Sequence, residues 1–200
     1  MSQITRVALV PAVPALLEEY AGLSDPVAEL RSACRKAVTW LVEGGPAEVV
    51  VLGDRRVTHG IAVPRSERVA RSLLTETGFT GRMSRDGLPT EDIRDSVVLV
   101  LANGSACRDE LTPSRLDELA AEFDRHLEAL LCAGDGRGLR ALDAALAGEL
   151  LADGVPSLQT LGEVLGEHCA GTVDYSDSPF GVQYWVARWR LDERQGACAS

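Results

Sequence analysis

Two uninterrupted runs of β-branched and other apolar residues constrain the fold of this chain more than any other feature. AEVVVLG occupies residues 47–53, and DSVVLVLANG occupies residues 95–104. A strand that is exposed on one face alternates between apolar and polar side chains, whereas a strand buried on both faces of a parallel sheet is almost continuously Val, Ile and Leu. Both runs therefore predict central strands of a parallel sheet that is covered by helices on its two faces.

A helical pattern separates the first of these runs from an earlier one. Residues 4–10 are a third apolar run, which ends at prolines and predicts a strand that leads into a loop. Residues 25–45 carry apolar residues at helical spacing, with Asp25 as the expected cap, Pro26 in the first turn and a Gly-Gly pair at the end. Strand, helix and strand in succession form a βαβ unit.

The rest of the chain is mostly helical and closes with an apolar strand. Helical spacing predicts helices at residues 66–78, 113–135, 138–154 and 157–169. Residues 176–191 read as a strand in which both alternating sets of side chains are mostly apolar, so we expect it to be covered on both faces. The two sets are Phe180, Val182, Tyr184 and Val186 on one face, and Gln183, Trp185, Ala187 and Trp189 on the other.

Together these elements predict an α/β fold in one domain. The domain is expected to span residues 1–192, with a mainly parallel central sheet, helices on both faces and a late antiparallel strand; residues 193–200 are expected to be a frayed tail. Aromatic residues make up only 4% of the chain, so those of the closing strand should be buried. Either the chain's own helices cover both faces, or the face with Trp185 and Trp189 forms a homo-oligomer or contacts a second protein.

The net charge and the cysteine pattern indicate which partners are excluded and in which cellular compartment the protein is expected. The formal net charge is −10 and the arginines are scattered, which argues against nucleic acid or an anionic membrane surface as the partner. No run approaches the roughly 18 apolar residues of a membrane helix, and the first apolar run is too short for a signal peptide. Five widely spaced cysteines without a CxxC pair are typical of reduced thiols, so we expect a cytoplasmic protein. Lys36 is the only lysine, and such a composition is typical of a GC-rich bacterial genome.

The polar motifs are weak. No GxxxxGK[ST], GxGxxG, HExxH or CxxC pattern occurs, so the common nucleotide and zinc signatures are absent. Asn103, Gly104 and Ser105 follow a buried strand, and ligands of open α/β sheets bind at the carboxyl ends of strands. Their backbone N–H groups could therefore bind an anion. A serine after such a strand also resembles a nucleophile elbow, although the GxSxG pattern is missing, and this leaves a hydrolase as one alternative.

The three histidines form no obvious metal site. His59 lies near the end of a strand or turn, where a solvated loop histidine and a titrating or binding histidine are both consistent with the sequence. His126 lies on the apolar stripe of the helix at residues 113–135, so it is expected to be partly buried. His168 precedes Cys169, and adjacent residues of a helix point about 100° apart, which disfavours a shared metal.

Several segments, in order, resemble one family. They are similar to segments of class III extradiol ring-cleavage dioxygenases. The similar segments are the loop VALVPAVPALLEEYAG, the strand VVVLGD, the segment LVLANGSACRDEL, the helical EFDRHLEALLCAGDGRGLRAL and the closing DYSDSPFGVQYWVARW. The likeness is to their catalytic B-subunit superfamily with its Memo-like relatives, and the closing strand resembles a compact actinobacterial subgroup. The similarity covers nearly the whole chain and implies an α/β fold.

At the chemical positions the chain departs from that family. Active members hold Fe(II) with two histidines and a third ligand, and a further histidine acts as acid and base. By the resemblance, the first histidine position is Ala12, the second falls near Asp54, the acid/base position near Ala106 and the third ligand near Asp153. Because methyl groups neither bind iron nor transfer protons, the resemblance implies a non-catalytic homologue without a cofactor, which binds a small molecule or a protein.

Two alternatives stay open beside this interpretation. One is a metal-dependent ring-cleavage dioxygenase that binds Fe(II) through Asp54, His59 and Asp153, and the other is a hydrolase that uses Ser105. In each case we expect the loops after the first three strands to meet at one edge of the sheet and to form a concave site. The residues expected in that site are Pro11, Asp54, Asn103 and Ser105.

Overall fold

The computed structural model describes residues 4–17, 25–54, 63–85, 96–107, 115–167 and 169–191. The strands are β1 (Ile4–Val10), β2 (Glu48–Leu52), β3 (Arg82–Arg85), β4 (Ser96–Leu101), β5 (Thr172–Asp177) and β6 (Tyr184–Arg190). The helices are α1 (Ala28–Val42), α2 (Arg65–Glu76), α3 (Arg115–Ala133), α4 (Gly136–Arg140), α5 (Ala144–Glu149) and α6 (Val155–Leu165), with short 3-10 turns η1 (Pro14–Leu16) and η3 (Pro179–Gly181). Within these ranges no helix is long and apolar enough to cross a lipid bilayer.

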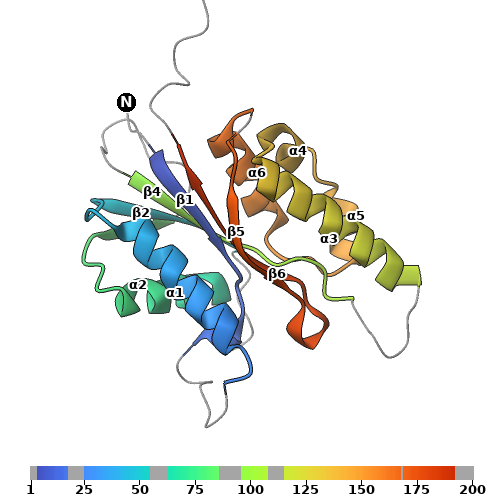
Figure 1. The fold of residues 1–200 in the computed structure, drawn as a ribbon, viewed down its shortest axis with the longest axis horizontal. Helices are drawn as coiled ribbons and strands as arrows, with labels where there is room; N and C mark the ends of the chain where they lie inside the picture. Colours follow the sequence, from blue (N-terminus) through green and yellow to red (C-terminus); the bar gives the residue numbers. More distant parts are fainter. Residues whose placement is uncertain are drawn as a thin grey trace, which may run out of the picture.

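The strands form one sheet in the order β3-β2-β4-β1-β6-β5 (Figure 1). The first four of these strands are parallel neighbours, β6 is antiparallel to β1, and β5 is antiparallel to β6. The predicted α/β class, with a mainly parallel sheet and a late antiparallel strand, is confirmed. The hydrophobic pattern did not predict the two outer strands, β3 and β5, because their side chains are exposed or half-buried and form no apolar run.

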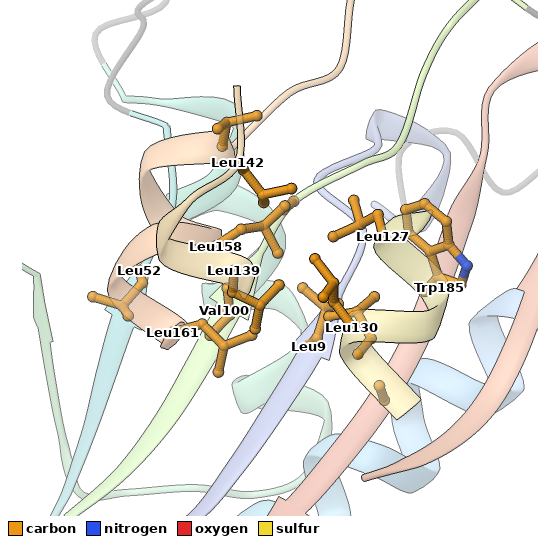
Figure 2. Close-up of a cluster of buried hydrophobic side chains, with 14 of the residues drawn as sticks. Leu9, Leu52, Val100, Leu127, Leu130, Leu139, Leu142, Leu158, Leu161 and Trp185 are labelled. Atoms are coloured by element: carbon orange, nitrogen blue, oxygen red, sulfur yellow. The ribbon is translucent and has the colours of Figure 1, made fainter. Parts of the chain in front are cut away.

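Helices cover both faces of the sheet, which explains the uninterrupted apolar runs. On one face, Val49 and Val51 of β2 belong to a cluster with α1 and α2. On the other face, Val50 and Leu52 of the same strand belong to a cluster with α3, α4, α5 and α6. Figure 2 shows the second cluster, where leucines of α3, α4 and α6 gather over the central strands. Alternate residues of a central strand thus enter different cores, so neither set can be polar.

Two predictions about the helices are wrong in detail. The helix expected at residues 138–154 is two short helices, α4 and α5, because the carboxylate of Asp143 accepts hydrogen bonds from the backbone N–H groups of Ala145 and Leu146 and so starts a new helix. His126 is exposed rather than partly buried. Asp124, two positions earlier in α3, is buried instead.

The closing strand is shorter than predicted. It begins at Tyr184, and Phe180 lies in the turn η3 with a φ of 64° and 68% of its surface exposed. The expectation that Phe180 is buried in the strand is therefore wrong. Trp185 and Trp189 are 2% and 1% exposed and pack within the cluster of α3, so the chain's own helices cover this face. Because both rings are buried inside the chain, the interpretation of this face as an interface is wrong for these two tryptophans.

Candidate functional site

A cavity of about 510 Å³ lies at the carboxyl ends of β1, β2 and β4. The loops after these strands form one side of it, and the start of α2, the segment between α5 and α6, and the segment before β6 form the rest. Its polar lining residues are Asp54, Arg65, Ser66, Asn103, Asp153 and Tyr184. Its apolar lining includes Ala12, Val13, Ala106, Leu151, Ala152 and Val182.

The structure brings most of the residues singled out in the sequence to this cavity. Ala12, Asp54, Asn103, Ala106 and Asp153 all line it. Pro11, Gly104 and Ser105 belong to the same loops but are not among the lining residues. His59 lies outside the described residues.

Asn103 joins three of the loops. Its side-chain oxygen accepts a hydrogen bond from the backbone N–H of Ala12 at 2.9 Å, and its own backbone N–H donates to the carbonyl of Asp153, also at 2.9 Å. Asn103 is 8% exposed. Its side-chain nitrogen, Nδ2, makes no hydrogen bond with any described residue, so the group left toward the cavity is a donor.

Ser105 is held away from the cavity. It is fully buried, its hydroxyl donates to Asp124 at 2.7 Å, and its backbone N–H donates to the same carboxylate at 2.9 Å. A Cβ on the neighbouring Gly104 would lie 2.6 Å from the ring of Trp185, so only glycine fits this approach. The Asn-Gly-Ser segment is thus explained by its packing against α3, and this geometry does not favour a nucleophilic Ser105.

Asp124 was missed in the sequence. Asp124 directly follows Phe123, which belongs to the apolar stripe of the helix. This position beside the apolar stripe is the signal that could have identified Asp124 as a buried residue. Buried carboxylates are stable only when they are hydrogen-bonded.

An ion pair spans the cavity wall. Arg65, the first residue of α2, binds Asp153 with 2.6 Å between Nη2 and Oδ2. The hydroxyl of Ser66 donates to the backbone carbonyl of Asp54 at 2.7 Å and fixes the loop after β2. Because the side chains of Arg65 and Asp153 are 45% and 20% exposed, solvent screens this pair, and its role lies in positioning more than in stability.

Tyr184 is another cavity residue that the sequence did not single out for the site. It is 5% exposed, it lines the cavity, and its hydroxyl makes no hydrogen bond with any described residue. Burial raises the pKa of Tyr184, and the nearby charge of Arg65 opposes the rise, so the phenol is protonated at neutral pH. The sequence showed Tyr184 only as an apolar residue of the closing strand, and no local motif marks it.

None of the described residues that line the cavity is a histidine of the kind that holds iron in the family that the sequence resembles. Among the described residues, no group of three or more His, Cys, Asp or Glu is arranged to hold a metal ion. Ala12 and Ala106 present methyl groups to the cavity, and the guanidinium of Arg65 binds Asp153, where it competes with any cation. Fe(II) in a facial triad needs two imidazoles and a carboxylate.

No protein-family model matches the chain, and no curated protein is significantly similar to it. The resemblance to extradiol dioxygenases therefore depends on the segments of this sequence alone.

Proposed function

We propose that this chain is an extradiol dioxygenase-like protein without catalytic iron, and that it binds a small molecule in the cavity at the carboxyl edge of its sheet. The cavity itself carries this proposal. Small-molecule sites typically enclose roughly 300–1,000 Å³ and combine an apolar lining with a few polar groups. The cavity of about 510 Å³ has both features and lies where open α/β sheets bind ligands.

Gly148 provides a direct test. It belongs to α5 and lines the cavity, and a Cβ at this position would have no heavy atom within 4 Å. Gly148→Ala should therefore leave the fold and the cavity unchanged, whereas the larger side chain of Gly148→Phe should reduce the space in the cavity. In a fragment screen followed by protein NMR, wild type and Gly148→Ala should share ligands that Gly148→Phe does not bind. Equal binding by all three proteins, or none in a broad screen, would contradict the proposal.

Loss of iron is the second part of the proposal, and the methyl groups of Ala12 and Ala106 support it. Protein purified without a chelator should contain no tightly bound iron. After anaerobic addition of Fe(II), it should not cleave protocatechuate or simple catechols. Iron in nearly equimolar amount, or a yellow ring-opened product that forms with ordinary turnover, would overturn this part.

One observation favours the metal-dependent alternative: Asp54 and Asp153 line the same cavity. With His59 they would supply the three ligands of that hypothesis. The test is the metal content of wild type against Asp54→Asn and Asp153→Asn. A metal that is present in wild type and lost in both variants would favour the dioxygenase over the binding protein.

Two further parts of the proposal concern origin and compartment. We infer a cytoplasmic bacterial protein from the arginine-rich composition and from cysteine usage. Among the described residues, Cys34, Cys107, Cys132 and Cys169 form no disulfide with one another, which supports a reducing compartment. An active-serine probe should not label the protein, because the hydroxyl of Ser105 is buried and bound to Asp124.

A further inference from the structure

The helix α2 ends in a hydrogen-bond pattern that places one residue in the left-handed region. The backbone N–H of Gly78 donates to the carbonyl of Thr75 at 3.0 Å, and the N–H of Phe79 donates to the carbonyl of Leu74 at 3.1 Å. Gly78 has a φ of 71°. Such a helix end favours glycine, because a Cβ is strained in this conformation. The helix α3 ends in the same pattern, also with a glycine, Gly134, whose φ is 58°.

The helix α5 ends in the same pattern but has a leucine where α2 and α3 have glycine. The N–H of Leu151 donates to the carbonyl of Gly148 at 3.2 Å, and the N–H of Ala152 donates to the carbonyl of Ala147 at 2.9 Å. Leu151 has a φ of 55°, is 64% exposed and lines the cavity. A leucine at this position strains the backbone and leaves an apolar side chain in water, so the stability of the fold does not account for it.

Phe180 combines the same two features. The N–H of Gly181 donates to the carbonyl of Ser178 at 3.2 Å and closes a turn. Pro179 and Phe180 are the central residues of this turn, and Phe180 has a φ of 64° where a turn favours glycine or asparagine. Phe180 is 68% exposed. Among the described residues, Leu151 and Phe180 are the only non-glycine residues with a positive φ, and they are also the two most exposed large apolar side chains.

Backbone hydrogen bonds join both segments to the loop after β4. The N–H of Ala106 donates to the carbonyl of Leu150, directly before Leu151, at 3.0 Å. The N–H of Gln183, three positions after Phe180, donates to another carbonyl of the same loop at 2.9 Å. The residue before Gln183 lines the cavity, as Leu151 does. Both exposed side chains therefore belong to segments that form the cavity, and strained residues of this kind are concentrated at functional sites.

We propose that Leu151 and Phe180 form an apolar rim of the cavity, and that this rim binds a hydrocarbon chain or ring of the ligand. Because Leu151 itself lines the cavity, a hydrocarbon that fills the cavity can reach the rim. A specific protein interface needs roughly 20–30 residues a side, far more than these two side chains supply, so a small apolar group is the better occupant. This inference depends on the proposed function, since it names the ligand class of the same site.

A series of straight-chain alcohols, n-butanol, n-hexanol and n-octanol, tests the rim. Each methylene that leaves water for apolar surface tightens binding by up to about fourfold. Dissociation constants from NMR titration should therefore fall along the series in wild type. Leu151→Gly and Phe180→Gly should each weaken n-octanol by about threefold or more. Their effect on n-butanol should be smaller, because the shorter chain reaches less of the rim.

Gly78→Leu is the matched control, because it makes the reciprocal change at the end of α2. A Cβ on Gly78 would have no heavy atom of the described residues within 4 Å, and Gly78 is not among the residues that line the cavity. This variant should bind n-octanol like wild type and should melt at a lower temperature. Leu151→Gly should melt at the same temperature as wild type or a higher one, because it removes the strain.

Three results would overturn the rim and leave the binding function intact, provided that the fragment screen still finds ligands of the cavity. One is a clearly lower melting temperature for Leu151→Gly, which would mean that the leucine packs in the fold. Another is alcohol binding that is absent, or that neither rim variant changes. The third is a wild-type dimer that the rim variants convert to a monomer, which would make the two side chains a subunit contact. If no alcohol binds and the fragment screen also fails, the proposed function itself is wrong.

Discussion

The loop after β4 contributes to two neighbouring regions, and the polar side chains that the loop itself supplies to them differ in their hydrogen bonds. The first region, the buried anchor, consists of Gly104 and Ser105 with Asp124 and Trp185. The second, the pocket wall, consists of Asn103 and Ala106 with Tyr184. In the anchor, the hydroxyl and N–H of Ser105 are both bound by one carboxylate from α3. In the wall, the Asn103 amide nitrogen and the Tyr184 hydroxyl have no partner among the described residues.

Because of this difference, residues that stabilise the fold and residues that are available to bind a ligand lie only a few positions apart in the sequence. Groups that are satisfied inside the chain stabilise the folded state, and removing one partner leaves the other buried and unpaired. Groups without an internal partner contribute little to folding, but they are available to a ligand. Variants of the anchor should therefore change stability first, and variants of the wall should change binding first.

The largest loss of stability is expected when Trp185 is replaced. Its ring packs in the cluster with Leu127 of α3, as Figure 2 shows. Its indole nitrogen has no hydrogen-bond partner in the described part of the chain, so its contribution is apolar packing. Trp185→Ala should lower the unfolding free energy by about 3–5 kcal/mol. The melting temperature should fall by the same amount at every protein concentration. If the variant instead converts a dimer into an equally stable monomer, Trp185 lies in a subunit interface and does not belong to the buried anchor.

A smaller loss is expected at Asp124. Asp124→Ala removes the acceptor of two hydrogen bonds from Ser105 and should cost about 3 kcal/mol in urea unfolding, because hydrogen bonds to charged groups contribute about 1.5–3 kcal/mol each and rarely add fully. The matched change elsewhere in the cavity lining is Asp153→Ala, whose partner Arg65 is solvent-exposed; about 1 kcal/mol or less is expected there. Equal losses in the two variants would show that the carboxylate of the buried anchor is no more important for stability than a carboxylate that lines the cavity.

The sequence predicted the anchor poorly and the position of the cavity well. Continuous apolar runs identified three of the four parallel strands, and the rule that ligands bind at their carboxyl ends located the loops of Ala12, Asp54 and Asn103. The loop sequences do not indicate their partners across the chain, because Asp124 is 19 residues from Ser105 and Arg65 is 88 residues from Asp153. Tyr184 was ambiguous for a similar reason: an aromatic residue in an apolar strand looks the same whether or not its hydroxyl reaches a cavity.

The smallest effect is expected from the titration of Tyr184, and it tests whether the pocket wall is truly desolvated. Burial raises the pKa of Tyr184 above its unfolded value of about 10, because the phenolate is poorly solvated in the folded state. The folded state then holds its proton more tightly than the unfolded state. The stability that results is complete below about pH 10 and is lost as the pH rises through the folded pKa.

Tyr184→Phe cannot titrate, so between pH 8 and about pH 10.5 its unfolding free energy should fall less than that of wild type. The buried thiol of Cys34, whose pKa is also raised by burial, contributes to the loss in both proteins and cancels in the difference. An equal fall in both proteins would mean that the hydroxyl is as well solvated as in the unfolded chain. The wall would then be an open surface, and its lack of internal partners would no longer point to a ligand.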